Sequence, residues 1–134
     1  MPEIFTDLTG AFRAAGPVLL PGMAVKTRHV TVQNGETYAP DLRQGGHQHI
    51  HIAGAAVTIA NPILGGFLFA GWSQVLFTHV MNESGGAITI TWGSAYKQAA
   101  FTDPTDGNGV ATVWNFDSNS GLWYSSGRNT VPNA

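Results

Sequence analysis

From Lys26 onward the chain consists of short segments in which apolar and polar residues alternate, with turn-forming residues between them every ~8–15 residues. The clearest alternation runs from 88 to 92, with Ile88, Ile90 and Trp92 on one side. A period of two is the pattern of a strand that turns one face to a core. Turns are marked by Asn34-Gly35 and by the polar run 117–121. Because no long segment has helical spacing, the sequence predicts an all-β fold.

About seven to eight such strands predict an antiparallel, jelly-roll-like β-sandwich over residues 26–134. The segment 75–81 is apolar on both sides, which predicts a strand that is covered on both faces. The sequence has no repeat of fixed period, and this argues against a propeller or a solenoid. With 134 residues in total, one domain accounts for the chain.

Residues 1–25 differ in character and are expected to form an extended N-terminal arm. Gly16-Pro17 ends any helical turn that begins near Thr6, and Pro21 keeps the intervening residues out of a central strand. The arm is too apolar for a free tail, so we expect its apolar side chains to bind a partner or to cover an edge of the chain's own sandwich. These side chains are Phe5, Leu8, Phe12, Val18, Leu19 and Leu20.

The low charge content narrows the possible partners. Charged residues make up 10% of the chain, against about 25% in an ordinary soluble domain. Six Lys and Arg against eight Asp and Glu leave no basic excess for nucleic acid, and no apolar run is long enough to cross a bilayer. Surfaces that are buried between proteins are depleted in charge, so we expect a homo-oligomer, with a trimer preferred. No secretory signal is recognisable, which favours synthesis in a cytoplasm.

Three histidines are the candidate metal ligands: His47, His49 and His51 share one face of an expected strand. Neutral imidazole is a good ligand for Zn²⁺ and similar ions, and a site at an oligomer axis would multiply the number of ligands. The chain has no cysteine, and no carboxylate lies within the histidine run to orient the rings. The alternative is therefore a polar face toward solvent or another subunit, with no metal and no cofactor.

No motif predicts an enzyme. The chain lacks the Gly-x-Ser-x-Gly turn of serine hydrolases and the glycine patterns of phosphate-binding loops. Asp103 and Asp106 lie in a turn-forming run and are expected to be solvated turn residues, not the paired carboxylates of a glycosidase. If the protein binds carbohydrate, Tyr96 and Tyr124 are the candidates for stacking on sugar rings.

Four motifs in the second half of the chain fall at expected strand ends and turns. They are Ile59-Ala60-Asn61-Pro62, Asn82-Glu83-Ser84-Gly85-Gly86, Thr91-Trp92-Gly93-Ser94-Ala95-Tyr96-Lys97 and the closing hairpin Asp117–Trp123. Together they resemble a small β-sandwich module that recurs in structural proteins of tailed-bacteriophage virions. The resemblance covers roughly half of the chain. The closing hairpin is longer than the family's, and the N-terminal leader lies outside the match.

The resemblance implies a virion structural protein without enzymatic activity, made in the host cytoplasm. The expected function is that of a capsid decoration (cement) subunit, which binds the major capsid protein or other virion structural proteins through its N-terminal arm. A tail-fibre chain carries such a module after a long stalk, whereas this chain is nearly all module. The alternative is a tail, neck or head-fibre appendage subunit that attaches to the virion or binds host surface carbohydrate.

Overall fold

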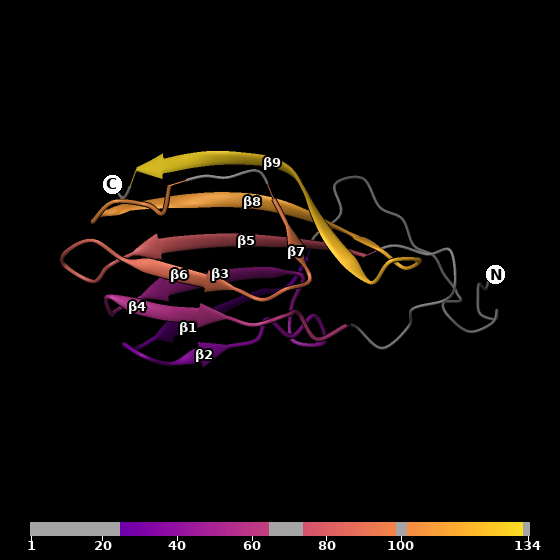
Figure 1. Cartoon of the computed structure of the whole chain (residues 1–134), viewed down its shortest axis with the longest axis horizontal. Coiled ribbons are helices and arrows are strands. Elements are labelled where there is room, and N and C mark those ends of the chain that lie inside the picture. Colours follow the sequence, from indigo (N-terminus) through magenta and orange to yellow (C-terminus); the bar gives the residue numbers. More distant parts are fainter. Residues whose placement is uncertain (1–24, 65–73, 99–101, 133–134) are drawn as a thin grey trace, which may run out of the picture.

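A computed structural model describes residues 25–64, 74–98 and 102–132, and these residues form β-strands and no helix (Figure 1). The all-β class predicted from the sequence is thereby confirmed. The apolar residues of the expected arm lie outside the described residues. The strands are β1 (Thr27–Val32), β2 (Thr37–Tyr38), β3 (His47–Ile52), β4 (Ala56–Ile59), β5 (Val75–Asn82), β6 (Thr89–Trp92), β7 (Tyr96–Lys97), β8 (Asn108–Asp117) and β9 (Leu122–Pro132).

The strands form two sheets that share one apolar core. Sheet A has six strands in the order β1-β3-β5-β8-β9-β7, and sheet B has three in the order β2-β4-β6. In Figure 1 the strands follow one another from β1 and β2 at one side of the molecule, through β3, β4, β5 and β6, to β8 and β9 at the other side. The buried residues of both sheets belong to a single cluster, with Ile50 and Leu76 from sheet A and Val57 and Ile90 from sheet B.

The pairing direction differs from the expected antiparallel sandwich. Strands β1, β3 and β5 pair in parallel and in register, and so do β2, β4 and β6. Because consecutive strands alternate between the sheets, β1–β2, β3–β4 and β5–β6 are three coils of a short parallel stack, an arrangement of the solenoid kind. Antiparallel pairing in the described residues joins β8 to β5 and β8 to β9. The expectations of antiparallel pairing throughout and of no solenoid-like stacking were wrong.

Unequal coil lengths hid the repeat. His29, His49 and His79 occupy equivalent positions in β1, β3 and β5, but they are 20 and 30 residues apart in the sequence. The longer interval lies in the connection between β4 and β5. A repeat of variable length gives no fixed period, and a half-buried strand alternates in the same way whether its neighbour is parallel or antiparallel.

Large aromatic side chains close the core beside the last coil. Ring centroids lie 5.4 Å apart for Trp92 and Trp114, 4.8 Å for Tyr96 and Trp114, and 4.9 Å for Phe116 and Trp123. Trp114 and Trp123 are fully buried. Aromatic pairs at these separations contribute about 0.5–1.5 kcal/mol each beyond the area that they bury. The β8–β9 hairpin therefore seals the apolar interior of the stack.

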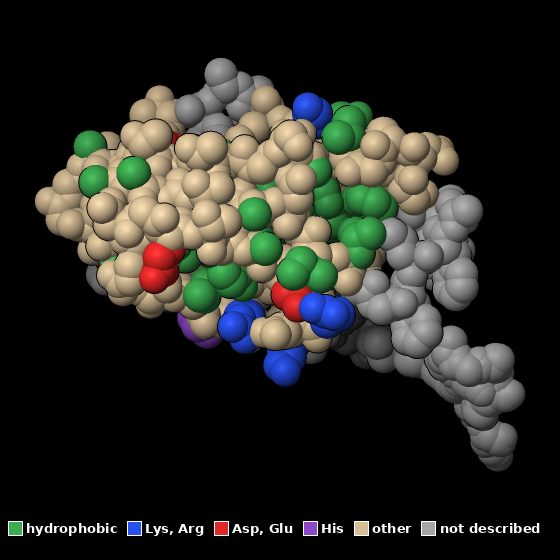
Figure 2. Space-filling view, turned by 60° about the horizontal axis from the view of Figure 1, so that its bottom comes forward, with side chains coloured by type: hydrophobic (Ala, Val, Ile, Leu, Met, Phe, Trp, Pro, Cys, Tyr) green, Lys and Arg blue, Asp and Glu red, His purple; other side chains and the backbone are tan. Residues whose placement is uncertain are grey.

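The surface reflects the scarcity of charge in the sequence. Figure 2 views one face of the molecule, on which uncharged groups cover most of the area and charged side chains stand in a few separate places. One ion pair joins Asp41 to the neighbouring Arg43, with 2.7 Å between Oδ2 and Nη2. The hydrogen bond from Arg43 holds the pKa of the Asp41 carboxyl below its usual range.

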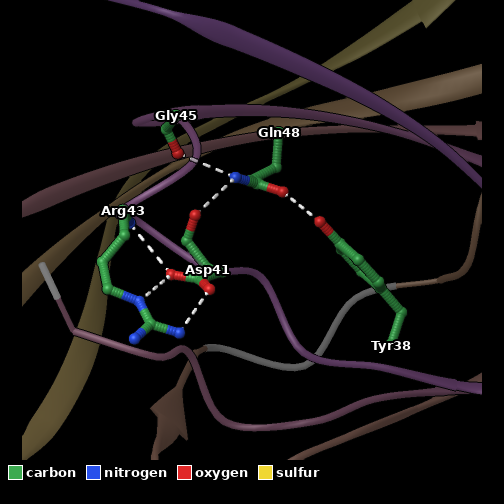
Figure 3. Close-up of polar contacts among 5 residues, drawn as sticks. All are labelled: Tyr38, Asp41, Arg43, Gly45 and Gln48. Carbon is green, nitrogen blue, oxygen red and sulfur yellow. Dashed lines mark hydrogen bonds and ion pairs between the residues drawn. The ribbon is translucent and has the colours of Figure 1, made fainter.

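Gln48 links sheet A to sheet B through a network of hydrogen bonds with Tyr38, Asp41 and Gly45 (Figure 3). Its side chain is fully buried in β3, where Oε1 accepts a hydrogen bond from the Tyr38 hydroxyl of β2. Its Nε2 donates to the carbonyl oxygens of Gly45 at 2.7 Å and Asp41 at 3.3 Å. All the hydrogen-bonding groups of the Gln48 amide therefore have partners within the fold.

Replacing Gln48 tests this network. Gln48→Leu keeps the volume but removes the acceptor of the Tyr38 hydroxyl and the side-chain donor to the Gly45 carbonyl, while the Asp41 carbonyl keeps the Gln44 backbone donor at 2.9 Å. We expect the free energy of unfolding, measured by urea denaturation, to fall by about 2–4 kcal/mol. The matched variant Tyr38→Phe removes a single hydrogen bond and should cost about 1 kcal/mol. Equal stability of Gln48→Leu and the unmodified protein would contradict the role of Gln48.

Gly93 allows a close approach of two chain segments. A Cβ atom there would lie 2.2 Å from Oδ1 and 2.6 Å from the backbone nitrogen of Asn61. That Oδ1 accepts a hydrogen bond from the Ala95 backbone nitrogen at 2.9 Å. Glycine is required at this position because a side chain would have no space beside Asn61.

We therefore expect Gly93→Ala to lower the free energy of unfolding by about 1–3 kcal/mol, because the Asn61 segment must move. Gly86→Ala is the control, since a Cβ at Gly86 meets nothing within 4 Å. Thermal denaturation followed by circular dichroism measures both. A Gly93→Ala melting temperature no lower than that of Gly86→Ala would contradict the packing argument.

Candidate functional site

The outer face of sheet A carries all five histidines of the chain. We call this surface, formed by the outward positions of β1, β3, β5 and β8, the histidine face. Parallel pairing in register places one histidine of each strand in a row across the sheet. The five residues are His29 in β1, His47, His49 and His51 in β3, and His79 in β5.

The central imidazoles stack on one another. His49 lies between His79, with ring centroids 4.4 Å apart and planes at 9°, and His29, with centroids 4.8 Å apart and planes at 37°. Along β3, the rings of His49 and His51 lie 4.5 Å apart with planes at 15°. His47 stands at the other end of β3, where its ring meets the edge of Phe77 with centroids 6.4 Å apart.

Three histidines bring their nitrogen atoms close enough to share an ion: His29, His49 and His51, one ligand atom from each lying within 4.8 Å of the others. Of the expected ligands, His49 and His51 belong to this group and His47 does not. The expectation that His47, His49 and His51 share a face agrees with the burial of the alternating residues in β3. His29 was missed, because its approach depends on pairing between strands.

A weak signal for His29 and His79 is present in the sequence. In β1, β3 and β5 a histidine is followed by a β-branched aliphatic residue, in His29-Val30, His49-Ile50 and His79-Val80. In each pair the aliphatic side chain turns toward the core and the histidine turns outward. The shared dipeptide marks equivalent positions of successive coils, although its uneven spacing makes it hard to recognise.

A carboxylate lies next to the histidine group. Glu83 follows β5, and its Oε2 lies 2.7 Å from Nδ1 of His51. No carboxylate lies within the histidine run of the sequence itself, and the fold supplies one from a distant segment. The register pairs His51 with Met81, two residues before Glu83, and this accounts for the contact.

Burial and mutual repulsion keep the inner histidines uncharged. Partial burial, followed by the neighbouring histidines, lowers the pKa of His49 to about 4. The same causes lower the pKa of His79. The Nε2 atoms of both rings are buried and have no hydrogen-bond partner among the described residues. Near neutral pH these two rings therefore add no positive charge to the face.

The rest of the histidine face carries little charge. Among the outward positions of β1, β3, β5 and β8, the one Lys, Arg, Asp or Glu is Asp117 at the end of β8, where it accepts hydrogen bonds from the Asn119 backbone nitrogen and Ser120 Oγ. Val75 and Phe77 are exposed by 41% and 36%, and Phe77 lines a shallow pocket of about 450 Å³ together with His47 and Val113. The combination of two uncharged inner imidazoles, His49 and His79, with exposed apolar groups gives a surface that suits contact with protein better than contact with bulk water.

The other candidate residues have structural roles. Asp103 accepts a hydrogen bond from the Ile90 backbone nitrogen at 3.0 Å, and Asp106 accepts one from the Gly85 backbone nitrogen at 2.9 Å. Tyr96 is buried and its hydroxyl donates to the Ala60 carbonyl, so its expected availability for a sugar ring was wrong. Tyr124 is 45% exposed.

No family model, curated protein or solved structure matches this chain. The resemblance to phage virion modules therefore stays a prediction that rests on the four motifs. Among the described residues, no helix is long and apolar enough to cross a membrane.

Proposed function

We propose that this protein is a non-enzymatic structural subunit of a tailed-phage virion, and that it decorates the capsid as a homotrimer. Two independent lines support the proposal: the four motifs that resemble a virion module, and the histidine face, whose inner rings His49 and His79 are uncharged near neutral pH. The histidine face carries more weight, because it is a property of the folded chain and calls for a partner.

The low charge and the exposure of the histidine face support contact with another protein. Parallel strands are usually covered on both faces of their sheet. Here one face of β1, β3 and β5 packs on the core, while the other carries exposed apolar groups and no Lys, Arg, Asp or Glu. The centres of protein interfaces are depleted in charged residues in the same way. We assign this face to contact between copies of the chain, and closed symmetry limits their number.

The N-terminal arm supplies the contact with the particle in this proposal. Its apolar residues Phe5, Leu8, Phe12, Val18, Leu19 and Leu20 precede β1, which is an edge strand of sheet A. The arm therefore leads directly into an edge strand of sheet A. Such an arrangement lets one surface bind sister subunits while the arm binds the major capsid protein.

A charge placed in the histidine face tests the assembly. Phe77→Glu puts a carboxylate in a surface that we expect to be buried between copies, so sedimentation should change from a trimer to a 14.2 kDa species. Ile63→Glu is the matched control, because Ile63 is exposed by 41% but lies outside sheet A. A folded Phe77→Glu protein that remains trimeric, or an unmodified protein that is monomeric at high concentration, would contradict self-assembly through this face.

Location on the particle is tested with gold-labelled antibody against the protein. We expect label over the heads, and we expect particles incubated with a chain that lacks residues 2–23 to show none. Label confined to tails would reject decoration and favour the appendage function. A truncated chain that folds and still binds heads with unchanged affinity would contradict the role of the arm.

A further inference from the structure

We propose that His29, His49 and His51 form a site for one divalent transition-metal ion, with Zn²⁺ the expected occupant, inside a single chain. This inference goes beyond the proposed function and does not depend on it. It rests on the convergence of three imidazoles from two paired strands and on the carboxylate that contacts one of them.

The distances suit an ion after a small adjustment. The three ligand nitrogens lie within 4.8 Å of one another. Zinc–nitrogen bonds of about 2.0–2.1 Å place two tetrahedral ligands roughly 3.3 Å apart. The nitrogens must therefore approach by about 1.5 Å at most, a distance that side-chain rotation covers. His29 is exposed and His51 is half-buried, so both rings have room to turn.

The backbone of the site is held firmly. His49 and His51 are two residues apart on one strand, so both project from the same face. His29 is the direct register partner of His49 on the adjacent strand β1. Ligands carried by neighbouring strands of one sheet are positioned better than ligands on loops. Only the side chains need to move when the ion binds.

Glu83 provides the second, independent indication of a ligand. Its carboxylate lies 2.7 Å from Nδ1 of His51. Because a carboxylate only accepts hydrogen bonds, this contact requires the proton on Nδ1, and in the neutral ring Nε2 is then the nitrogen with a free lone pair for the ion. A carboxylate that orients a histidine in this way accompanies most metal-bound imidazoles and raises their basicity. Three histidines leave the fourth tetrahedral position to water or to a group from another molecule.

A stack of imidazoles without an ion is the competing explanation, and the chain contains controls that distinguish the two. His47 lies on the same strand and face but outside the group, whereas His29 and His51 are within it. If the imidazoles only pack on one another, substitution of any ring in the stack should lower the stability of the protein by a similar amount. Such a stack would have no specific affinity for metal.

The test is titration of the full-length protein with ZnCl₂ by isothermal calorimetry, after treatment with a chelator and dialysis. We expect one Zn²⁺ per chain. His29→Gln and His51→Gln should each weaken binding at least tenfold, Glu83→Gln should weaken it 10–100-fold, and His47→Gln should leave it unchanged. Circular dichroism confirms that each variant is folded. Substitution with Co²⁺ should give the visible absorption of a tetrahedral site, and this absorption should be lost in His29→Gln.

Three results would overturn the proposal: no saturable binding of Zn²⁺, unchanged affinity in His29→Gln and His51→Gln, or an equal loss in His47→Gln. One ion per three chains would also overturn it, because the ion would then lie on an oligomer axis. Phe77→Glu separates this question from the proposed function. If the site belongs to a single chain, that variant binds Zn²⁺ normally whether or not it forms trimers.

Discussion

Parallel pairing in register between β1, β3 and β5 is the interaction on which the rest of the structure depends. It aligns Val30, Ile50 and Val80 toward the core and, one residue earlier in each strand, a histidine toward the outside. A slip by one residue would exchange the two faces, burying imidazoles and exposing aliphatic groups. The cost of that exchange fixes the register, and the register in turn fixes which histidines are neighbours. Core packing and the candidate metal site are thus two results of one alignment.

The two ends of the stack are stabilised by different kinds of interaction. At the aromatic end, β8 reverses direction against β5 and brings Trp114 over the interior, where its Nε1 donates to Thr78 Oγ1 at 2.9 Å. Near the first coil, Gln48 links the two sheets through Tyr38 and two backbone carbonyls. Apolar packing supplies stability at one end, and a satisfied polar network supplies a defined geometry at the other.

The sequence predicted local features well and long-range ones poorly. The strand 88–92, the hairpin at 117–121 and the inward direction of Ile88 and Ile90 follow from alternation and turn residues, which are properties of neighbouring positions. The direction of pairing is set by the path of the chain between strands, and the alternation of apolar and polar residues carries no information about that path. The same limit applies to the site: His49 and His51 share a face because of their spacing, whereas His29 and Glu83 join them only through contacts between strands.

The unequal coils have a consequence for how this architecture changes over evolution and in engineering. Fifteen residues separate β4 from β5 but only eight separate β2 from β3, and yet β3 aligns with β1 and β5 aligns with β3 in the same register. The number of residues between β4 and β5 is therefore independent of the alignment of the strands. A lineage can lengthen this connection, or an engineer can graft a foreign peptide into it, while the strands that follow keep their neighbours.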